Sequence, residues 1–247
     1  MNETAAALTP ARRALLVSAH PEPHSFHASL RAAAVEELRA QGYAVQVSDL
    51  YAMGFKAALD REDFRTVYDA ERLNVSLEQR HAWANGGLAP DIASELGHLL
   101  DADLLLLLFP LWWFGMPALL KGWIDRVFVS GAVYGRSAVF ERGRLRGKRA
   151  LVGISTGAPA EAFGRHSLNG DIDDILMPLH RGILGFTGMT VLPPFVAYHV
   201  PYVGTSGRQA LLAAWRDHLR RLDSLVPLVM PKLADHPNAL AAGTRAC

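Results

Sequence analysis

The stretch from Leu104 to Phe128 is the sequence feature that most constrains the fold of this chain. It opens with five leucines and Phe109, an apolar run short enough for a strand that is buried on both faces of a parallel sheet. From Pro110 to Pro117, two tryptophans, a phenylalanine, a glycine and two prolines exclude a helix interior. Helical spacing of apolar residues then resumes. The stretch therefore predicts a strand, an aromatic loop and a helix that packs back onto the sheet.

Length, charge and cysteine content narrow the class of protein. A chain of 247 residues can form one α/β domain with its own core, and its net charge of +1 gives no reason to expect a nucleic-acid partner. The only cysteine, Cys247, excludes an intrachain disulfide and fits a reducing compartment. The amino terminus lacks the pattern of a signal peptide, and the longest apolar run is shorter than a membrane span. We therefore expect a cytoplasmic protein with no membrane span and no metal site.

Further strands and helices alternate along the rest of the chain. Strands are predicted at Ala14–Ala19, Tyr43–Ser48, Ala150–Ser155 and Thr190–Ala197, and helices from Ser25 to about Gln41, from Pro90 to about Leu100, from Asp171 to about Leu184 and from Gly207 to Leu225. This alternation predicts a doubly wound α/β domain with five parallel strands in the order 2-1-3-4-5. We expect a flexible leader over residues 1–12, the domain over 13–226 and an irregular tail over 227–247. Residues 49–89 have a weak pattern and are either an insertion that covers a site or a dimer contact.

Three loops follow strands that are neighbours in this order, so we expect them to meet at the carboxyl edge of the sheet. They are His20 to Phe26, Pro110 to Phe114, and Ser155 to about Asn169. The first loop has no glycine fingerprint for a dinucleotide. A serine at the start of a helix, with free N–H groups and the positive end of the helix dipole, suits a phosphate. A simple helix cap beside surface histidines explains the same residues equally well.

The second and third loops suggest a flat ligand. Trp113 and Phe114 lie beyond the strand and between two prolines, which favours a ligand contact, whereas Trp123 and Phe128 on the following helix are expected in the core. Backbone N–H groups of the third loop are suited to the negative charge that a flavin acquires on reduction. An ordinary connection between a strand and a helix is the alternative for that loop.

A set of motifs in matching order covers roughly Arg13 to Leu222. The motifs are SAHPEPHSF, DLYAMGF, LAPDI, FPLWWFGMPALLKGWIDRVF, STG and NGDIDDILMPLHRGILGFTG. Together they resemble the NAD(P)H:quinone oxidoreductase (DT-diaphorase) family of flavodoxin-like proteins, and the fourth motif is the most specific. The resemblance implies a homodimer that binds FAD, with FMN less expected. It also implies a two-electron, ping-pong transfer of hydride from NAD(P)H to flavin N5 and then to a quinone.

The resemblance also assigns site residues. Flavin contacts are implied for His20, Ser25, Phe26, His27, Asn74, Pro110, Leu111, Trp112, Trp113, Phe114, Ser155, Thr156, Gly157, Ala158, Phe163 and Arg208, with Asn74 and Arg208 as partner-subunit and outer flavin contacts. Catalytic contributions are implied for Tyr134, Gly157 and Asn169.

Several positions depart from the family pattern. Asn169 replaces a histidine, and a neutral amide cannot take up a proton. His166 is a candidate substitute, although a solvent-facing loop histidine is the simpler interpretation. Phe163 replaces a tyrosine, Trp112 a glutamine and Arg136 a second pocket tyrosine. These changes bear on the choice of substrate more than on the flavin.

Other functions remain open on the sequence alone. The same fold serves as a regulatory subunit that binds flavin and nucleotide to control a membrane transporter. It also serves as an electron carrier that binds FMN through a hydroxyl-rich phosphate loop. Within the enzyme class, azo dyes, nitroaromatics or chromate are alternative oxidants.

Overall fold

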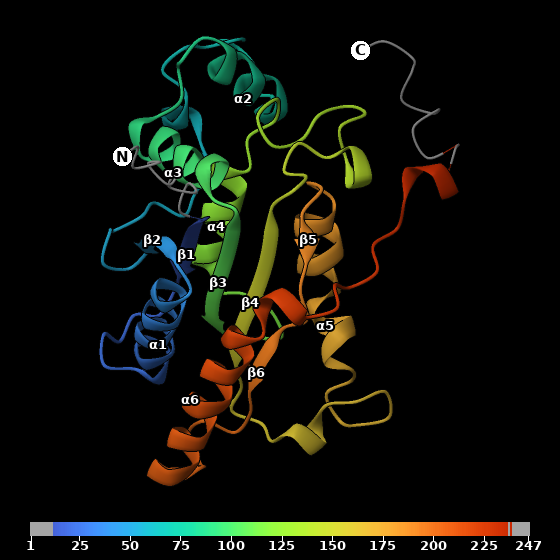
Figure 1. Ribbon diagram of the computed structural model, residues 1–247. Helices are drawn as coiled ribbons and strands as arrows, with labels where there is room; N and C mark the ends of the chain where they lie inside the picture. Colours follow the sequence, from blue (N-terminus) through green and yellow to red (C-terminus); the bar gives the residue numbers. More distant parts are fainter. Residues whose placement is uncertain (1–11, 237, 239–247) are drawn as a thin grey trace, which may run out of the picture.

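The computed structural model of the protein describes residues 12–236 and residue 238, and its centre is a parallel sheet (Figure 1). The strands are β1 (Arg12–Ser18), β2 (Tyr43–Asp49), β3 (Leu104–Pro110), β4 (Arg149–Ser155), β5 (Thr190–Val191) and β6 (Phe195–Ala197). Their order is β2-β1-β3-β4-β5, with β6 also paired to β4, and every pair is parallel. The predicted fold class and strand order are therefore confirmed. All seven residues of β3 are buried, as the leucine run predicted.

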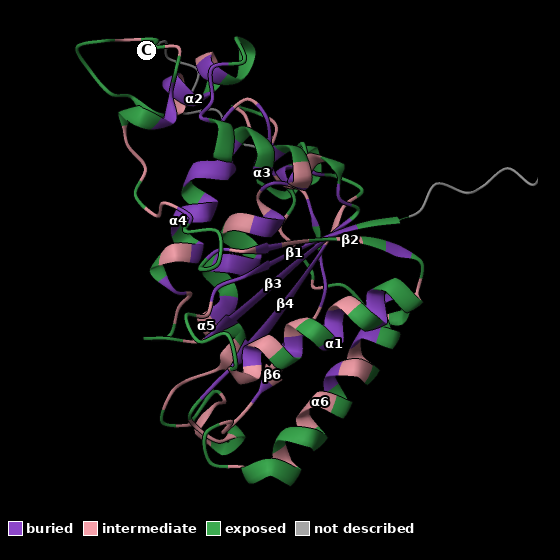
Figure 2. Ribbon diagram, turned by 90° about the vertical axis from the view of Figure 1, so that its left-hand side faces the viewer, coloured by how far each residue is buried: buried purple, intermediate pink, exposed green. Residues whose placement is uncertain are grey.

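Helices cover both faces of the sheet (Figure 2). The helices are α1 (Phe26–Ala40), α2 (Val75–Ala84), α3 (Pro90–Asp101), α4 (Ala118–Val127), α5 (Ile172–Leu179) and α6 (Gly204–Arg220). Helices α1 and α6 pack on one face, where Trp215 is fully buried with its ring centroid 4.9 Å from that of Phe195. Helices α3, α4 and α5 pack on the other face, where Trp123 is fully buried and Phe128 nearly so. The prediction that these two α4 aromatics belong to the core is confirmed.

The predicted fifth strand is wrong as a single element, because two short strands replace it. Leu192 N–H still donates to the Ala150 carbonyl at 2.8 Å, after which β5 ends. Pro193 and Pro194 follow and have no N–H group to continue the ladder. Pairing with β4 resumes only at Phe195. Within residues 12–236 the sheet therefore has six strands instead of the five expected.

Two predicted helices also differ at their ends. Helix α5 stops at Leu179, one residue after Pro178, and the chain continues as a π-helix over His180–Gly185. The proline lacks the N–H that an α-helix needs at that position. Helix α6 starts three residues earlier than expected, at Gly204, and ends at Arg220 instead of Leu225; a 3-10 turn follows.

The segment from residue 50 to residue 89 packs along α4 and contains α2, which the sequence pattern did not predict. The buried face of α2 includes Glu78 and Gln79, so the helix shows no apolar stripe. Both side chains are used: Glu78 accepts hydrogen bonds from the backbone N–H groups of Tyr68 and Asp69, at 2.7 and 2.9 Å. Gln79 donates to the carbonyl of Asp125 near the end of α4, at 3.1 Å.

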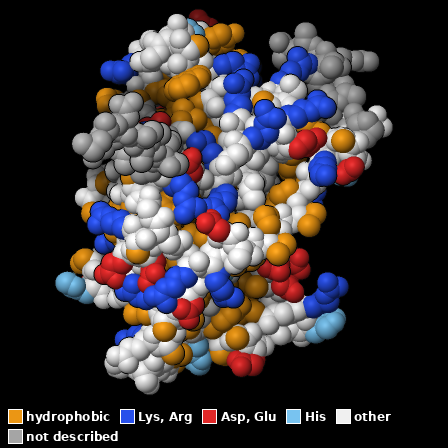
Figure 3. Space-filling view, viewed as in Figure 1, with side chains coloured by type: hydrophobic (Ala, Val, Ile, Leu, Met, Phe, Trp, Pro, Cys, Tyr) orange, Lys and Arg blue, Asp and Glu red, His pale blue; other side chains and the backbone are white. Residues whose placement is uncertain are grey.

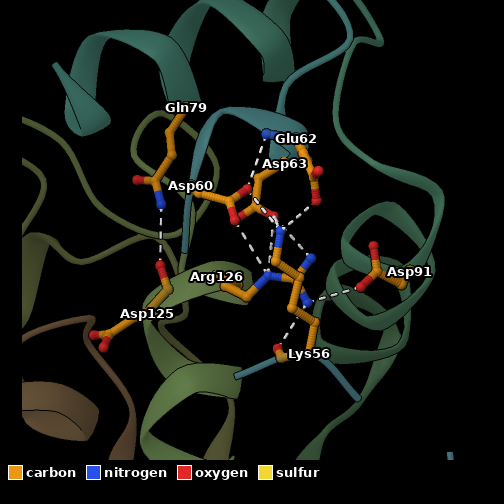
Figure 4. Close-up of polar contacts among 8 residues, drawn as sticks. All are labelled: Lys56, Asp60, Glu62, Asp63, Gln79, Asp91, Asp125 and Arg126. Carbon is orange, nitrogen blue, oxygen red and sulfur yellow. Dashed lines mark hydrogen bonds and ion pairs between the residues drawn. The ribbon is translucent and has the colours of Figure 1, made fainter. Parts of the chain in front are cut away.

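A buried ion cluster fixes the same segment to α4 (Figure 4). The guanidinium of Arg126 is 2% exposed and donates to both carboxylate oxygens of Asp63, at 2.9 to 3.1 Å. It also donates to the Lys56 carbonyl at 3.0 Å and to Asp91 at 2.7 Å. The cluster therefore joins the segment, the start of α3 and the helix that follows the aromatic loop.

The described part of the predicted tail is attached to the domain. Leu228 N–H donates to the carbonyl of Val191 in β5 at 2.8 Å. The carboxylate of Glu141 accepts from the N–H groups of Leu233 and Ala234, at 2.9 and 3.3 Å. Residues 1–11 of the predicted leader, and residues 237 and 239–247 of the tail, lie outside the described residues.

The surface carries charges of both signs. Figure 3 shows basic and acidic side chains interspersed over the face seen in Figure 1. Among residues 12–236, no helix is long and apolar enough to cross a membrane.

Candidate active site

Ser155, the last residue of β4, is the point where the three predicted loops meet. Its carbonyl accepts a hydrogen bond from Leu111 N–H in the aromatic loop at 2.9 Å. Its hydroxyl lies 2.7 Å from Nε2 of His27 in the first turn of α1. The next residue, Thr156, donates its N–H to the Ala197 carbonyl at the end of β6. Segments that are far apart in the sequence are thus connected at one edge of the sheet.

The start of α1 offers hydrogen-bond donors at this edge. Ser25 is the N-cap, and its hydroxyl accepts from Ala28 N–H at 3.2 Å. The first N–H groups of a helix have no partner within it and point outward. Nδ1 of His20 accepts from Glu22 N–H at 3.0 Å, so the neutral ring carries its proton on Nε2. The start of α1 therefore has donors of the kind that suit a phosphate, and the phosphate site stays a prediction.

His27 is the buried member of a pair of stacked histidine rings. Its ring centroid lies 5.6 Å from that of His20, with 21° between the planes. Burial, followed by the neighbouring His20, lowers the pKa of His27 to about 3, so the ring is neutral at pH 7. Its Nδ1 atom is buried and has no hydrogen-bond partner among the described residues. A buried polar atom without a partner is rare in native proteins and is a fit for a bound group.

The aromatic loop is a tight turn in a strained conformation. Trp112 and Gly115 exchange two backbone hydrogen bonds of 3.0 Å, and Trp113 and Phe114 between them have φ values of 51° and 59°. Left-handed backbone at two bulky residues is unfavourable and is common at ligand sites. Trp113 is 98% exposed, so packing of its ring against the described residues does not offset this strain. The rings of Trp113 and Phe114 are therefore accessible from outside, whereas the ring of Trp112 lies 6.1 Å from that of His20.

The third loop leaves backbone donors available. Thr156 closes a turn through its hydroxyl, which donates to the Ala158 carbonyl at 2.7 Å, and His199 N–H donates to the same carbonyl at 3.1 Å. Among the described residues, the N–H groups of Gly157 and Ala158 donate no hydrogen bond. This loop can therefore donate to the polar edge of a ligand.

Two positions that depart from the family pattern, Phe163 and Asn169, lie further along this loop, as does His166. Asn169 is half-buried, and its backbone N–H donates to the Ala162 carbonyl at 2.9 Å. His166 is exposed, as the simpler interpretation predicted. The ring of Phe163 packs 5.5 Å from that of Tyr198, a residue that was not predicted because nothing in its local sequence pattern distinguishes it. Burial, and to a lesser extent nearby carboxylates, raises the pKa of Tyr198, so its hydroxyl remains a donor at neutral pH.

Comparison with known proteins identifies the family. Residues 12–220 match the family model described as flavodoxin-like fold. The chain is 38% identical over 218 residues to NAD(P)H dehydrogenase [quinone] 1 of Cavia porcellus, covering 88% of this chain and 79% of that protein. It is 39% identical over 212 residues to human ribosyldihydronicotinamide dehydrogenase [quinone], covering 85% and 92%. The chain belongs to the NAD(P)H:quinone oxidoreductase family.

Solved structures agree with this assignment. A crystal structure from Klebsiella pneumoniae, of a protein provisionally named a quinone reductase, superposes with a TM-score of 0.83 at 38% identity and covers 87% of this chain and 86% of that one. The NAD(P)H:quinone oxidoreductase from Methanothermobacter marburgensis has a TM-score of 0.67 at 27% identity, with coverages of 86% and 98%.

Two residues that the family resemblance assigns to the site lie elsewhere in the single chain. Tyr134 follows α4, which returns the chain from the carboxyl edge of the sheet to the amino edge. Asn74 is the N-cap of α2, where its side chain accepts from Leu77 N–H at 3.3 Å. Helix α2 packs at the far end of α4, through a hydrogen bond of 3.2 Å between Ser76 and Ser130. Neither Tyr134 nor Asn74 is therefore brought to the three loops by the fold of one chain of this quinone oxidoreductase.

Tyr134 instead lines a cavity of about 460 Å³. Its ring lies 6.0 Å from that of Phe186, and Val75 of α2 borders the same space. Arg208, by contrast, is exposed near the amino end of α6, which starts at the carboxyl edge of the sheet like α1. Of the two outer contacts implied by the family, only Arg208 belongs to the same edge as the three loops.

Proposed function

We propose that this protein is a flavin-dependent NAD(P)H:quinone oxidoreductase. It passes a hydride from NAD(P)H to flavin N5 and then from the reduced flavin to a quinone, with both substrates using one pocket in turn. The observation that carries the proposal is the exposed, strained turn at Trp113 and Phe114, beside loops connected through Ser155. Membership of a family with relatives named for quinone reduction supports it.

The chain's own residues supply positioning and hydrogen bonds, whereas a bound flavin supplies the hydride carrier. The aromatic turn gives a flat wall for the ring system. The unused N–H groups of Gly157 and Ala158 are suited to donate to the pyrimidine edge, where a reduced flavin gathers negative charge. Asn169 adds a polar group that positions a substrate without taking up a proton.

We propose FAD as the flavin on the basis of charge. Arg31, the cation beside the start of α1, is already paired with Asp49. Both residues line a small hollow at the start of this helix, and Glu22 lines it too. The monophosphate of FMN carries nearly two charges at pH 7, whereas each phosphate of a diphosphate diester carries one. The residues that line this hollow offer neutral donors, and none of them is an unpaired cation. Such a site favours the diphosphate diester of FAD over the monophosphate of FMN. Release of the chromophore and identification by mass tests this assignment; recovery of FMN alone would contradict it.

We also propose a homodimer in which each pocket takes residues from both copies. Tyr134 and its cavity lie at the amino edge of the sheet, away from the turn at Trp113. A second copy related by two-fold symmetry would bring Tyr134 of one chain to the three loops of the other. The rings of Trp113 and Phe114 are exposed among the described residues, which supports this arrangement. A cytoplasmic location remains a prediction from the sequence.

The function is tested by transient kinetics. The purified protein should bind flavin, which NAD(P)H should bleach and a quinone should then reoxidise, both within the turnover time. A flavin that is bound but reduced much more slowly than turnover would favour a regulatory subunit. Flavin that accepts electrons only from another protein would favour an electron carrier. Oxidants of the azo, nitro and chromate classes, compared under the same conditions, show which class is used best.

Replacement of Trp113 by glycine should weaken flavin binding without cost to the fold. We expect an affinity for flavin that is lower by about tenfold, because one stacking wall is lost. Glycine accepts the left-handed backbone at this position, so the free energy of unfolding of the flavin-free protein should not fall. Fluorescence titration and urea unfolding measure the two effects. V229A, another highly exposed position, is the control that should change neither.

The shared pocket is tested by mixing two impaired variants at a flavin concentration too low to saturate W113G. W113G and Y134A should each reduce quinone turnover. In a mixed dimer, one pocket carries both changes and the other carries neither. Random pairing makes half of the dimers mixed, so about one pocket in four is intact. Refolding the two variants together should therefore restore about one quarter of wild-type activity. If both residues served the pocket of their own chain, every pocket of the mixed dimer would carry one change. The mixture would then be no more active than its components.

A further inference from the structure

A row of three arginines lies on the loop between α4 and β4. Arg142, Arg144 and Arg146 are exposed, whereas Gly143 and Leu145 between them are buried. The three side chains therefore lie on the outward face of this segment, and we call them the arginine row. Basic side chains are close together over this loop in the upper part of Figure 3. The loop thus carries a local excess of positive charge on a chain whose net charge is only +1.

The last two basic residues of the same run are used inside the fold, and the arginine row is not. Lys148 donates to two backbone carbonyls at the end of α3, at 2.5 and 2.7 Å. Arg149 forms an ion pair of 2.7 Å with Asp223. Among the described residues, the guanidinium groups of Arg144 and Arg146 make no hydrogen bond and no ion pair. Two guanidinium groups of this loop are therefore available to a ligand.

The arginine row lies beside the cavity that Tyr134 lines. The guanidinium of Arg144 lies 3.8 Å from the point where a side chain would start on Gly135, the residue after Tyr134. Leu145 N–H donates to the carbonyl of Thr187, another residue of the cavity wall, at 2.9 Å. These contacts from both sides fix the arginine row at one rim of the cavity.

The cavity itself suits an uncharged ring. Asp125 is the one charged residue among the described residues that line it, and its carboxylate is paired with Lys121 at 2.6 Å. In the proposed homodimer this space faces the flavin site of the other copy, so the nicotinamide ring of the reductant enters it. The adenosine end of the dinucleotide then remains outside, at the rim. Positive charge at the rim therefore meets the phosphorylated end of the reductant.

We propose that Arg144 and Arg146 bind the 2′-phosphate of NADPH, so that this chain selects NADPH over NADH as its reductant. The inference rests on the proposed function and on the proposed homodimer. A 2′-phosphate is a monoester that carries nearly two charges at pH 7, whereas each phosphate of the diphosphate common to both dinucleotides carries one. Two guanidinium groups match that charge, and each can donate two parallel hydrogen bonds to phosphate oxygens. In dinucleotide-binding folds, an arginine near the ribose accommodates this phosphate.

The test compares the two reductants with the flavin-loaded enzyme and a saturating quinone. The wild type should have a kcat/KM for NADPH at least about tenfold above that for NADH. R144Q/R146Q should lower kcat/KM for NADPH by about 10- to 100-fold, through KM, and that for NADH by no more than about twofold. R144K/R146K keeps the charge without the paired geometry and should recover part of the loss. R39Q removes an exposed arginine of α1, on the other face of the sheet, and should change neither value.

A second measurement does not depend on turnover. Adenosine 2′,5′-bisphosphate and adenosine 5′-monophosphate differ by the 2′-phosphate alone, and calorimetry measures the binding of each to the holoenzyme. The bisphosphate should bind at least about tenfold more tightly to the wild type, and added salt should reduce the difference. In R144Q/R146Q the difference should disappear.

Equal loss of NADPH and NADH in R144Q/R146Q would mean that the arginines contact the diphosphate that both share. Unchanged values for both would mean that the arginine row is only solvated surface. A wild type that uses the two dinucleotides equally well would leave nothing to select. Each of these results overturns this inference alone, whereas a bound flavin that neither dinucleotide reduces overturns the proposed function as well. If the double variant does not fold, R144Q and R146Q are compared singly, and each should weaken NADPH alone.

Discussion

Replacement of Asp63 by alanine is expected to lower the free energy of unfolding by about 3–5 kcal/mol. The change leaves the guanidinium of Arg126 buried without its main partner, since the remaining carboxylate, Asp91, is partly exposed. Taking an unpaired charge out of water is costly, whereas the intact pair satisfies the guanidinium with hydrogen bonds of 2.9 to 3.1 Å. Urea unfolding at pH 7 measures the loss.

A matched control lies on the same helix. Lys121 and Asp125 form an exposed ion pair of 2.6 Å, and K121M should cost less than about 0.5 kcal/mol because water screens that pair. A second comparison separates charge from packing: D63L combined with R126M should recover much of the stability lost in either single variant. If D63A cost no more than K121M, the cluster would not anchor residues 50–89 to α4.

Much of the fold could be predicted because its strands are buried on both faces. Such strands read as continuous apolar runs, and β3 was expected within one residue of its observed end. Helix α2 could not be predicted, since Glu78 and Gln79 occupy its buried face and bond to backbone groups that are near only in the folded chain. The break between β5 and β6 was readable from Pro193 and Pro194 but was outweighed by the apolar residues around them.

The candidate site was predictable as a set of loops and not as a set of contacts. Strand order alone implies that the loops share an edge. The bond between His27 and Ser155 joins residues 128 positions apart, and no local pattern indicates it. The resemblance assigned Tyr134 to the substrate pocket, but topology places it at the opposite edge of the same chain. The proposed homodimer, in which the partner copy supplies Tyr134, would resolve that conflict.

Acidification from pH 7 to pH 5 should destabilise the flavin-free protein by at least about 4 kcal/mol, mainly through two buried histidines, and His218, whose pKa is also lowered by burial, adds to the loss. Burial is the main cause that lowers the pKa of His27 to about 3, and burial lowers that of His180 to about 4. Both values lie below the 6.5 of an unfolded histidine, so the unfolded state binds more protons as soon as the pH falls below about 6.5. At pH 5 each histidine then costs about 2 kcal/mol, and the loss continues toward the folded pKa values.

The histidines can be separated from other titrating groups. Carboxylates whose pKa is lowered, such as Glu37 beside Arg220 and Arg216, change charge below this window and contribute at lower pH. H180L removes one buried histidine and should roughly halve the loss of stability between pH 7 and pH 5, whereas H166Q, at an exposed position, should leave it unchanged. Urea unfolding at several pH values gives the slope directly. A slope that is the same in H180L and in the wild type would mean that His180 takes up its proton over the same pH range in the folded and unfolded states, and burial would then not lower its pKa.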